Sequence, residues 1–206
     1  MLEFIVVFVV WAVGHSLTAD GRVKTAVRAR IGERAYTGLY RLGYNLFSLL
    51  SIVPVLLVLA WRVPDTVLWR MPAPYAWLAM VVQLLGFAGL LAALLQTDVW
   101  EFVGLRQAVN YWRGAAHLLP PPRLVTTGMY ALVRHPLYFF SLLILWPAPV
   151  LTLQTLIFNL MATLYLWAGS RVEERRLTAV FGTEYEAYRQ DVPGLLPMRG
   201  WKRVNH

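Results

Sequence analysis

The sequence predicts an all-α integral membrane protein: a helical bundle of about five transmembrane helices with a short cytoplasmic C-terminal helical cap. Composition is the first observation behind this prediction, because 58% of the 206 residues are hydrophobic and only 15% are charged. Soluble domains are less apolar than this. The second observation is that the apolar residues form runs close to the roughly 20 residues that a helix needs to cross a bilayer. The third is that nearly all Lys and Arg residues lie between those runs, where they mark a cytoplasmic face.

Three separate apolar runs predict the first three transmembrane helices, over residues 2–17, 39–61 and 75–96. The first run, LEFIVVFVVWAVGHSL, carries the acidic residue Glu3 near its start. A secretory signal would have a basic start and a small-residue cleavage site, so we expect this helix to be retained. Pro54 is expected to kink the second helix.

One long apolar run, from Leu137 to Gly169, predicts the fourth and fifth helices together. As a single helix it would extend roughly 50 Å, which is too long for a hydrocarbon core of about 30 Å. The chain is therefore expected to fold back. We place the turn at LTLQ, residues 151–154, after a helix that is bent by Pro147 and Pro149.

The basic residues orient this bundle. All but two of the 19 Lys and Arg residues fall in three segments, 22–41, 106–134 and 171–203. Arg62 and Arg70 are the exceptions, and both lie between the second and third predicted helices. Five crossings would bring the three basic segments to one side, so we expect the N-terminus outside and the C-terminus in the cytoplasm.

Several functional classes are disfavoured by the residues present. The chain has no cysteine, which excludes disulfides, thiolate metal sites and a cysteine nucleophile. No G-x-G-x-x-G motif follows a strand, so a soluble Rossmann-type enzyme is not expected. The basic residues behind the net charge of +8 lie between the apolar runs, as they do at a cytoplasmic membrane face. We therefore expect no nucleic-acid partner. The histidines show no metal-ligand spacing, and no metal is expected; they are His15, His117, His135 and His206.

Charged and titratable residues flank both ends of the long apolar run. Arg134 and His135 stand directly before it, in VRHPLYFFS, and Pro136 is well placed to begin the helix. Glu173 and Glu174 follow it, where carboxylates are costly unless they are solvated or paired. A purely structural interpretation is available: the arginine would reach lipid phosphates, and the glutamates would pair locally with the arginines of EERR.

The predicted hairpin brings these two ends to the same face of the membrane. Tyr185 and Tyr188 are three residues apart and so share a helix face. Tyr138 follows the RHP triplet by two residues and would otherwise be an aromatic-belt residue. Together with the charged residues, these tyrosines predict one pocket that offers cations for a carboxylate, carboxylates for an amine or ribose, and aromatic faces for a purine or sulfonium.

The stretch LVTTGMYALVRHPLYFF…VEERRLTAVFGTEYEAYRQDVPGLLP resembles the isoprenylcysteine carboxyl methyltransferase and phospholipid methyltransferase superfamily. The shared pattern is G-x-Y…R-H-P-x-Y, a helical hairpin, then E-E…G-x-x-Y…Y…V-P…P. DVWEFVGLRQ at 98–107 and HSL at 15–17 are similar to the bacterial branch that holds methanethiol S-methyltransferases and NnrU-like proteins. The positions that match the superfamily pattern G-x-Y…R-H-P-x-Y…E-E…G-x-x-Y…Y…V-P…P are Gly128, Tyr130, Arg134, His135, Pro136, Tyr138, Glu173, Glu174, Gly182, Tyr185, Tyr188, Val192, Pro193 and Pro197.

The resemblance implies one methyltransferase-like membrane domain over 1–206, in the bacterial inner membrane, with N-terminal helices in 1–127 and a cofactor-binding hairpin and cap in 128–197. It implies S-adenosylmethionine as cofactor and an acceptor that is a small thiol or a lipid-borne group of the isoprenylcysteine or phospholipid kind. His135 or Glu174 would take the proton of a thiol acceptor. The implied cofactor-binding residues are Tyr130, Arg134, His135, Pro136, Tyr138, Glu173, Glu174, Tyr185 and Tyr188.

Two other functions stay open at this point. Membrane sterol reductases share the R-H-P-x-Y and C-terminal tyrosine pattern, and Arg175 and Arg176 would suit the 2′-phosphate of NADPH. A non-catalytic NnrU-like membrane protein is the other. Phe140 stands where many relatives of that superfamily have glycine. Its bulky ring would narrow the cofactor or acceptor channel or signal lost activity. His15, Arg106 and Gln107 are further candidates for contact with a ligand, and the sequence does not give the oligomeric state.

Overall fold

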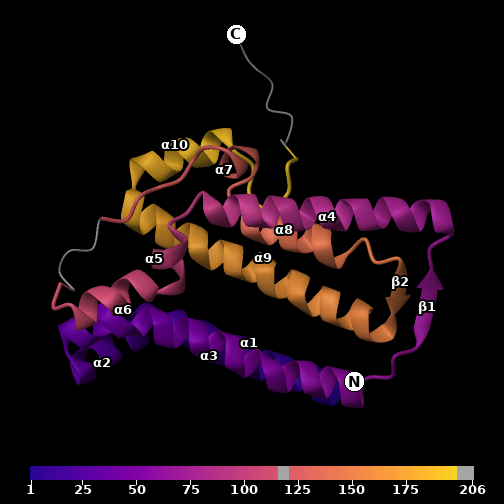
Figure 1. Ribbon diagram of the computed structural model, residues 1–206, viewed down its shortest axis with the longest axis horizontal. Coiled ribbons are helices and arrows are strands. Elements are labelled where there is room, and N and C mark those ends of the chain that lie inside the picture. The colour runs from indigo at the N-terminus through magenta and orange to yellow at the C-terminus, as the bar shows by residue number, and fades with distance from the viewer. Residues whose placement is uncertain (116–120, 199–206) are drawn as a thin grey trace, which may run out of the picture. The chain divides into compact units, whose positions relative to one another are not determined.

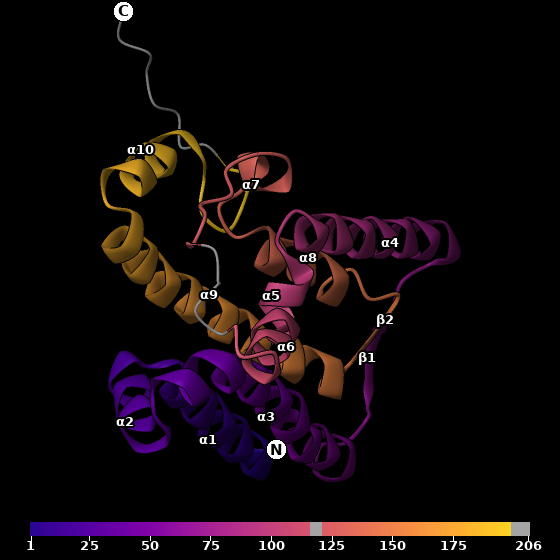
Figure 2. The same cartoon turned by 60° about the vertical axis from the view of Figure 1, so that its left-hand side comes forward.

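The computed structural model describes residues 1–115 and 121–198 of the chain (Figures 1 and 2). The described chain divides into two compact units, Met1–Thr66 with Asp98–Pro122 (unit 1) and Val67–Thr97 with Arg123–His206 (unit 2). His117 and His206 lie outside the described residues, and so do the last three members of the third basic segment, Arg199, Lys202 and Arg203.

Unit 1 is built on two long antiparallel helices, α1 and α3, which lie side by side in Figure 1. The amino group of Met1 donates to the carbonyl of Arg62 at 3.3 Å, and Glu3 forms an ion pair with Arg62 at 3.1 Å, so opposite ends of the two helices meet. Phe4 and Phe8 are buried in this unit. Its helices are α1 (Leu2–Ala19), α2 (Gly21–Ile31), α3 (Glu33–Arg62), α5 (Val99–Val103) and α6 (Leu105–Trp112).

Helices α5 and α6 are held on α3 by polar side chains. The Asn45 amide donates to the carbonyls of Phe102 at 2.9 Å and Val103 at 2.8 Å, and these carbonyls belong to the last turn of α5. Gly104 joins the two short helices with φ of +94°, and a Cβ there would meet the backbone of Leu42 at 2.5 Å. Glycine is required at this position because of both the positive φ and the close approach of the two backbones.

Unit 2 contains the predicted hairpin and one helix from earlier in the chain, α4, which packs along α8. The Phe140 ring of α8 lies against Gly89 of α4, where any Cβ would overlap it. This contact places the bulky ring in the interface between two helices. The elements of unit 2 are β1 (Val67–Arg70), α4 (Ala73–Leu95), α7 (Met129–Leu132), α8 (Pro136–Leu145), β2 (Val150–Thr152), α9 (Leu153–Phe181) and α10 (Thr183–Asp191).

A two-stranded antiparallel sheet, β1 with β2, was not part of the all-α prediction. Its register pairs Val67 with Thr152 and Arg70 with Val150. Both strands are short and sit beside apolar helical runs, so periodicity alone could not separate them from helix ends or loops. The sheet supplies backbone hydrogen bonds to a segment that leaves one apolar helix and enters another.

Helix α8 ends at Leu145 and α9 begins at Leu153, so the reversal starts earlier than the predicted turn at 151–154 but ends within it. The reversal itself is confirmed, but Pro147 and Pro149 lie after the helix and do not bend it. Two side-chain amides satisfy carbonyls freed at this end: Gln83 of α4 donates to Ile144 at 2.8 Å, and Asn159 of α9 donates to Leu145 at 2.7 Å. A helix end in apolar surroundings requires such partners.

Three helices of the described chain are long and apolar enough to cross a membrane: α1, α3 and α4. They correspond to the first three predicted helices, which are thereby confirmed as helices with somewhat different ends. Pro54 lies inside the continuous helix α3. Helix α8 is apolar but only ten residues long, and α9 continues beyond its apolar part into the charged EERR sequence.

Candidate functional site

Arg134 and His135 of the RHP triplet lie in a non-helical connection between α7 and α8. His135 is the N-cap residue of α8, and Pro136 occupies the first helical turn, where its missing N–H costs nothing. The backbone of this connection is paired with the chain after α10: Arg134 N–H donates to the carbonyl of Pro193 at 2.8 Å, and His135 N–H to Gly194 at 3.4 Å. The start of α8 and the C-terminal segment therefore form one local structure.

The Arg134 side chain joins α9 to α10, the helix that is called the cap below. Its Nε donates to Glu174 Oε1 at 3.1 Å, and Nη2 donates to the same oxygen. Its Nη1 donates to the carbonyls of Arg189 at 3.1 Å and Val192 at 2.5 Å, at the end of α10. The Arg134 and Glu174 side chains are each only 11% exposed, so all three guanidinium nitrogens are committed to the protein in a largely buried position.

The imidazole of His135 lies between the two carboxylates. Its Nδ1 is 3.3 Å from Glu173 Oε2, and its Nε2 is 3.4 Å from Glu174 Oε1. The Tyr138 ring stacks on it with centroids 5.5 Å apart and an interplanar angle of 8°. A neutral imidazole can donate to only one of these carboxylates, whereas an imidazolium can donate to both.

The two glutamates differ in their access to solvent. The Glu173 side chain is 44% exposed, against 11% for Glu174. Burial alone would raise the pKa of Glu173, but hydrogen bonds from His135 and Tyr138 and the charges of His135 and Arg176 lower it below its ordinary value. Burial opposes ionisation of Glu174 too, yet Arg134 and then His135 lower its pKa. Both groups are carboxylates at neutral pH, and Glu173 is the accessible one.

Three tyrosines complete the cluster, Tyr130 of α7 and Tyr185 and Tyr188 of α10. Tyr188 donates its hydroxyl to the carbonyl of Tyr130 at 2.5 Å, and the rings of Tyr185 and Tyr188 meet edge to face with centroids 6.0 Å apart. Burial and the charge of Glu173 raise the pKa of Tyr130 to about 12. Tyr185 is fully buried, and its hydroxyl makes no hydrogen bond to any described residue. Burial and Glu174 raise the pKa of Tyr185, while the nearby charge of Arg134 lowers it in part.

Comparison with known proteins decides the family. The family model described as "NnrU protein" matches residues 3–176. The chain belongs to the NnrU family. It is 35% identical over 192 residues to methanethiol S-methyltransferase 1 of Bradyrhizobium diazoefficiens, covering 92% of this chain and 64% of that protein. It is 36% identical over 147 residues to methanethiol S-methyltransferase 2 of the same organism, covering 71% and 56%.

A third relative of this NnrU-family chain is the protein-S-isoprenylcysteine O-methyltransferase of Schizosaccharomyces pombe, which is 38% identical over 82 residues, 36% of this chain and 33% of that protein. The resemblance to the isoprenylcysteine methyltransferase superfamily is thereby confirmed. The chain spans 56% to 64% of the length of the two methanethiol relatives named above. No solved structure matches the chain with significance.

The residues of the pattern shared with the isoprenylcysteine methyltransferase superfamily are largely brought together in unit 2. Arg134, His135, Tyr138, Glu173 and Glu174 are linked by direct contacts. Through Arg134, the backbone at the end of α10 joins the same structure, and α10 carries the tyrosine pair. These contacts form one cluster of charged and aromatic side chains at the end of the hairpin.

Other candidates from the sequence belong to unit 1 and have partners there. Arg106 forms an ion pair with Asp98 at 2.6 Å. The Gln107 amide nitrogen donates to Glu101 at 3.1 Å, while its buried Oε1 has no hydrogen-bond partner among the described residues. His15 Nε2 lies 3.0 Å from the hydroxyl of Tyr44. The 98–107 motif of this NnrU-family chain is thus tied to capping and packing within its own unit.

Sequence reasoning missed two residues that support the cluster, Gln96 and Gly194. Gln96, at the end of α4, accepts a hydrogen bond from Met129 N–H at 2.9 Å. Its side chain occupies the space that a Cβ at Gly128 would need, and Gly128 has φ of +63°. Gly194 lets the chain pass close to the Arg134 guanidinium, since a Cβ there would lie 3.3 Å from Nη2. The glycines of the motif could have indicated these close approaches, but the sequence does not show that Gly128 packs against the end of α4.

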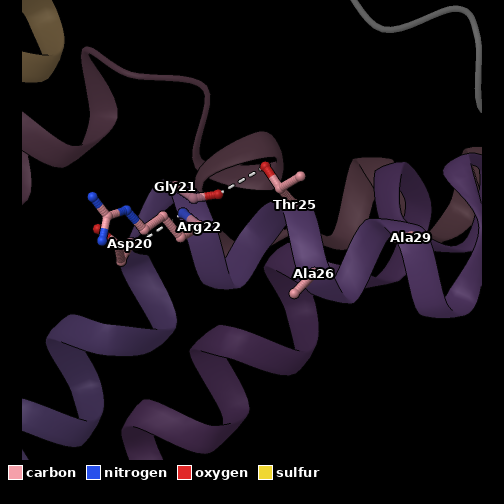
Figure 3. A pocket seen from close by; sticks show the side chains of 6 residues that line it. All are labelled: Asp20, Gly21, Arg22, Thr25, Ala26 and Ala29. Atoms are coloured by element: carbon pink, nitrogen blue, oxygen red, sulfur yellow. Dashed lines mark hydrogen bonds between the residues drawn. The ribbon is translucent and has the colours of Figure 1, made fainter.

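A wide hollow lies in unit 1 of this NnrU-family chain. It measures about 680 Å³ and lies along α2, lined by Asp20, Gly21, Arg22, Thr25, Ala26 and Ala29 (Figure 3). Asp20 accepts from Arg22 N–H at 2.8 Å, and Thr25 donates to the Gly21 carbonyl at 3.0 Å, so the polar groups in view serve the first turn of α2. The hollow is wide open and gathers no reactive side chains, and we base the functional argument on the cluster in unit 2.

Proposed function

We propose that this chain is an integral membrane methyltransferase that uses S-adenosylmethionine and methylates a small thiol. The observation that carries the proposal is the cluster in unit 2, where His135 lies between Glu173 and Glu174 beneath a cap held by Arg134. The names of the relatives, methanethiol S-methyltransferases, support the reaction class and the thiol acceptor. Because the chain spans only part of those proteins, its activity remains a proposal.

The chemistry of the cluster fits this cofactor. Glu173 offers an accessible carboxylate for the ammonium group or the ribose hydroxyls, and the buried Tyr185 hydroxyl has no hydrogen-bond partner within the described part of the chain. The Tyr138 ring would present an aromatic face to a cation. The bound cofactor would supply an activated methyl group, so positioning by these residues would carry much of the catalysis. Tyr130, Pro136 and Tyr188 would support the pocket wall.

The sequence predicts Arg134 as a cofactor-binding residue, but its contacts favour a positioning role. Its guanidinium is committed to Glu174 and to two carbonyls of the cap, so we propose that it positions the cap and Glu174. A thiol acceptor must also lose its proton. Glu174 is a weak base because Arg134 keeps its pKa low. We propose that His135 accepts the proton and that the adjacent carboxylates stabilise the imidazolium.

We propose five membrane crossings, with α8 and α9 as the fourth and fifth. Helix α8 would cover roughly 15 Å of a core of about 30 Å, and the non-helical segment from Trp146 to Thr152, which ends in β2, would continue the crossing. The sheet and the amides of Gln83 and Asn159 would satisfy the non-helical backbone. The N-terminus would then lie outside a bacterial inner membrane, and α10 would form a cytoplasmic cap.

Equilibrium binding to the detergent-purified full chain tests the function directly. We expect S-adenosylmethionine to bind and Glu173→Gln to weaken binding about tenfold or more, the effect of losing a hydrogen bond to a charged group. Glu184→Gln, at an exposed position on α10, is the matched control and should bind normally. Transfer of a labelled methyl group to methanethiol would then identify the acceptor.

The other outcomes of this experiment identify the alternatives. Binding of NADPH without S-adenosylmethionine would favour the reductase. Binding of neither would favour a non-catalytic protein of the NnrU kind. Tyr185→Phe gives an independent measurement, because removing an unpartnered buried hydroxyl should leave stability unchanged or improved. A weaker affinity for S-adenosylmethionine in that variant would show that the hydroxyl faces the cofactor.

A further inference from the structure

An apolar groove opens in unit 1 where α1, α2 and α3 come together. Its volume is about 260 Å³, and its lining includes Thr18 of α1, Ile31 of α2, and Tyr40, Gly43 and Phe47 of α3. A Cβ built at Gly43 would meet nothing within 4 Å, so the missing side chain helps to keep the groove open. Ile31 and Phe47 are 48% and 43% exposed, which leaves apolar surface for an occupant to cover.

The position of the groove along the helices places it at the edge of the bilayer. Helix α2 connects two candidate membrane spans, α1 and α3, and therefore lies at the membrane surface. Helix α3 has 30 residues, roughly 45 Å, so its first turns extend beyond a hydrocarbon core of about 30 Å. The lining from Tyr40 to Phe47 covers about 10 Å of α3, leading from that surface toward the core.

A cation stands at the outer end of the groove. Arg28 and Ile31 are three residues apart and share a face of α2. The Arg28 guanidinium lies over the Tyr36 ring, 4.5 Å from its centroid, and the Tyr36 and Tyr40 rings are 4.8 Å apart. Tyr40 lines the groove, so a continuous line of contacts connects the cation to it. The ion pair between Arg28 and Glu33 has side chains 52% and 68% exposed and can exchange for another anion at little cost.

The charge on α2 favours an anionic occupant. The helix carries four basic residues and no acidic one: Arg22, Lys24, Arg28 and Arg30. Asp20, which precedes it, is engaged in capping its first turn. Basic residues beside a transmembrane helix attract anionic lipids, and a groove that is apolar below and cationic above matches the two ends of such a molecule.

We propose that this groove binds one anionic phospholipid, with an acyl chain along Gly43 and Phe47 and the headgroup phosphate at Arg28. The inference is independent of the proposed methyl transfer, since every residue that carries it lies in unit 1. A free phosphate would use only the cationic end, and a zwitterionic phospholipid would gain less from the basic helix. The bound lipid would fix the α1–α2–α3 corner at the membrane surface.

Native mass spectrometry of the full chain in detergent tests the site, with dioleoyl phosphatidylglycerol and dioleoyl phosphatidylcholine as probes. We expect the wild type to retain the anionic lipid several-fold more than the zwitterionic one. Arg28→Gln should remove most of that preference, because the charge-assisted contact to the phosphate is lost. Gly43→Leu should reduce retention of both lipids, because a Cβ there meets nothing within 4 Å, the larger side chain would occupy the groove, and leucine favours the helix.

Matched variants and a competitor separate this site from a general charge effect. Arg22→Gln removes the same charge from the other end of α2, and Gly14→Leu fills open space on α1 outside the groove lining. Both should retain lipid like the wild type, and glycerol phosphate should not displace the lipid. Equal retention of the two lipids by the wild type would overturn the proposal. Unchanged retention in Gly43→Leu, a loss in Arg22→Gln equal to that in Arg28→Gln, or displacement by glycerol phosphate would overturn it equally.

Discussion

The contacts of Arg134 predict how strongly the cap is held in unit 2. Replacing Arg134 with Gln removes the cationic partner of Glu174, whose side chain is only 11% exposed. Breaking a buried pair by removing one partner costs about 3–5 kcal/mol. The variant also weakens two donations to carbonyls of the cap, each worth roughly 1 kcal/mol. Partial solvation of the carboxylate reduces the sum, and we expect a loss of about 3 kcal/mol, roughly a 150-fold shift toward the detached cap.

Hydrogen exchange measured by mass spectrometry in detergent gives this quantity for each segment. Peptides from α10 should exchange about 100-fold faster in Arg134→Gln, while peptides from α4 should keep the wild-type rate. Arg189→Gln is the matched control, because Arg189 contributes its backbone carbonyl and its side chain is not needed for that contact. An α10 exchange rate within about threefold of the wild type would refute the assignment of Arg134 as the residue that holds the cap.

Three further predictions concern unit 2. Asn159→Leu should lower stability by about 1–3 kcal/mol in thermal unfolding, because it leaves the Leu145 carbonyl without its donor. Gly89→Ala should destabilise by about 1–3 kcal/mol by overlapping the Phe140 ring, and adding Phe140→Leu should recover part of the loss; strict additivity would contradict this. Burial opposes ionisation of Glu174, but Arg134 keeps its pKa below 4.5. The ionised Glu174 carboxylate should therefore contribute fully to folding stability above that pH, and this contribution should disappear as the pH falls through the lower folded-state pKa. Thermal unfolding measured as a function of pH should show this loss in the wild type and not in Glu174→Gln.

Long apolar runs were the part of the fold that the sequence predicted well. Helices α1, α3 and α4 follow from run length alone, because a spanning helix satisfies its own backbone and needs little from its neighbours. The end of α8 could not be predicted in this way. It depends on Gln83 and Asn159, two amides far apart in the sequence, and only the packing of three helices shows that they meet the same helix end.

The candidate site was predictable as a group of residues and less so in the role of each. A hairpin must return to its starting face, so the meeting of His135 with Glu173 and Glu174 followed from the topology. The commitment of Arg134 to the cap did not, since its acceptors at Arg189 and Val192 are backbone carbonyls with no sequence signature. Gln96, which supports the glycine before α7, lies on a helix that the motif does not include.

The two amides at the end of α8 also limit how unit 2 can move. Sliding α8 by one helical turn, about 5.4 Å, past its neighbours would break both donations where little water is available to replace them. The opposite end of α8 is held at Arg134 by charged groups next to an accessible carboxylate, where solvent can substitute. A piston-like displacement is therefore disfavoured. Opening of this unit would be a hinge motion with its pivot near Leu145 and its largest displacement at His135, while β1 and β2 stay in register.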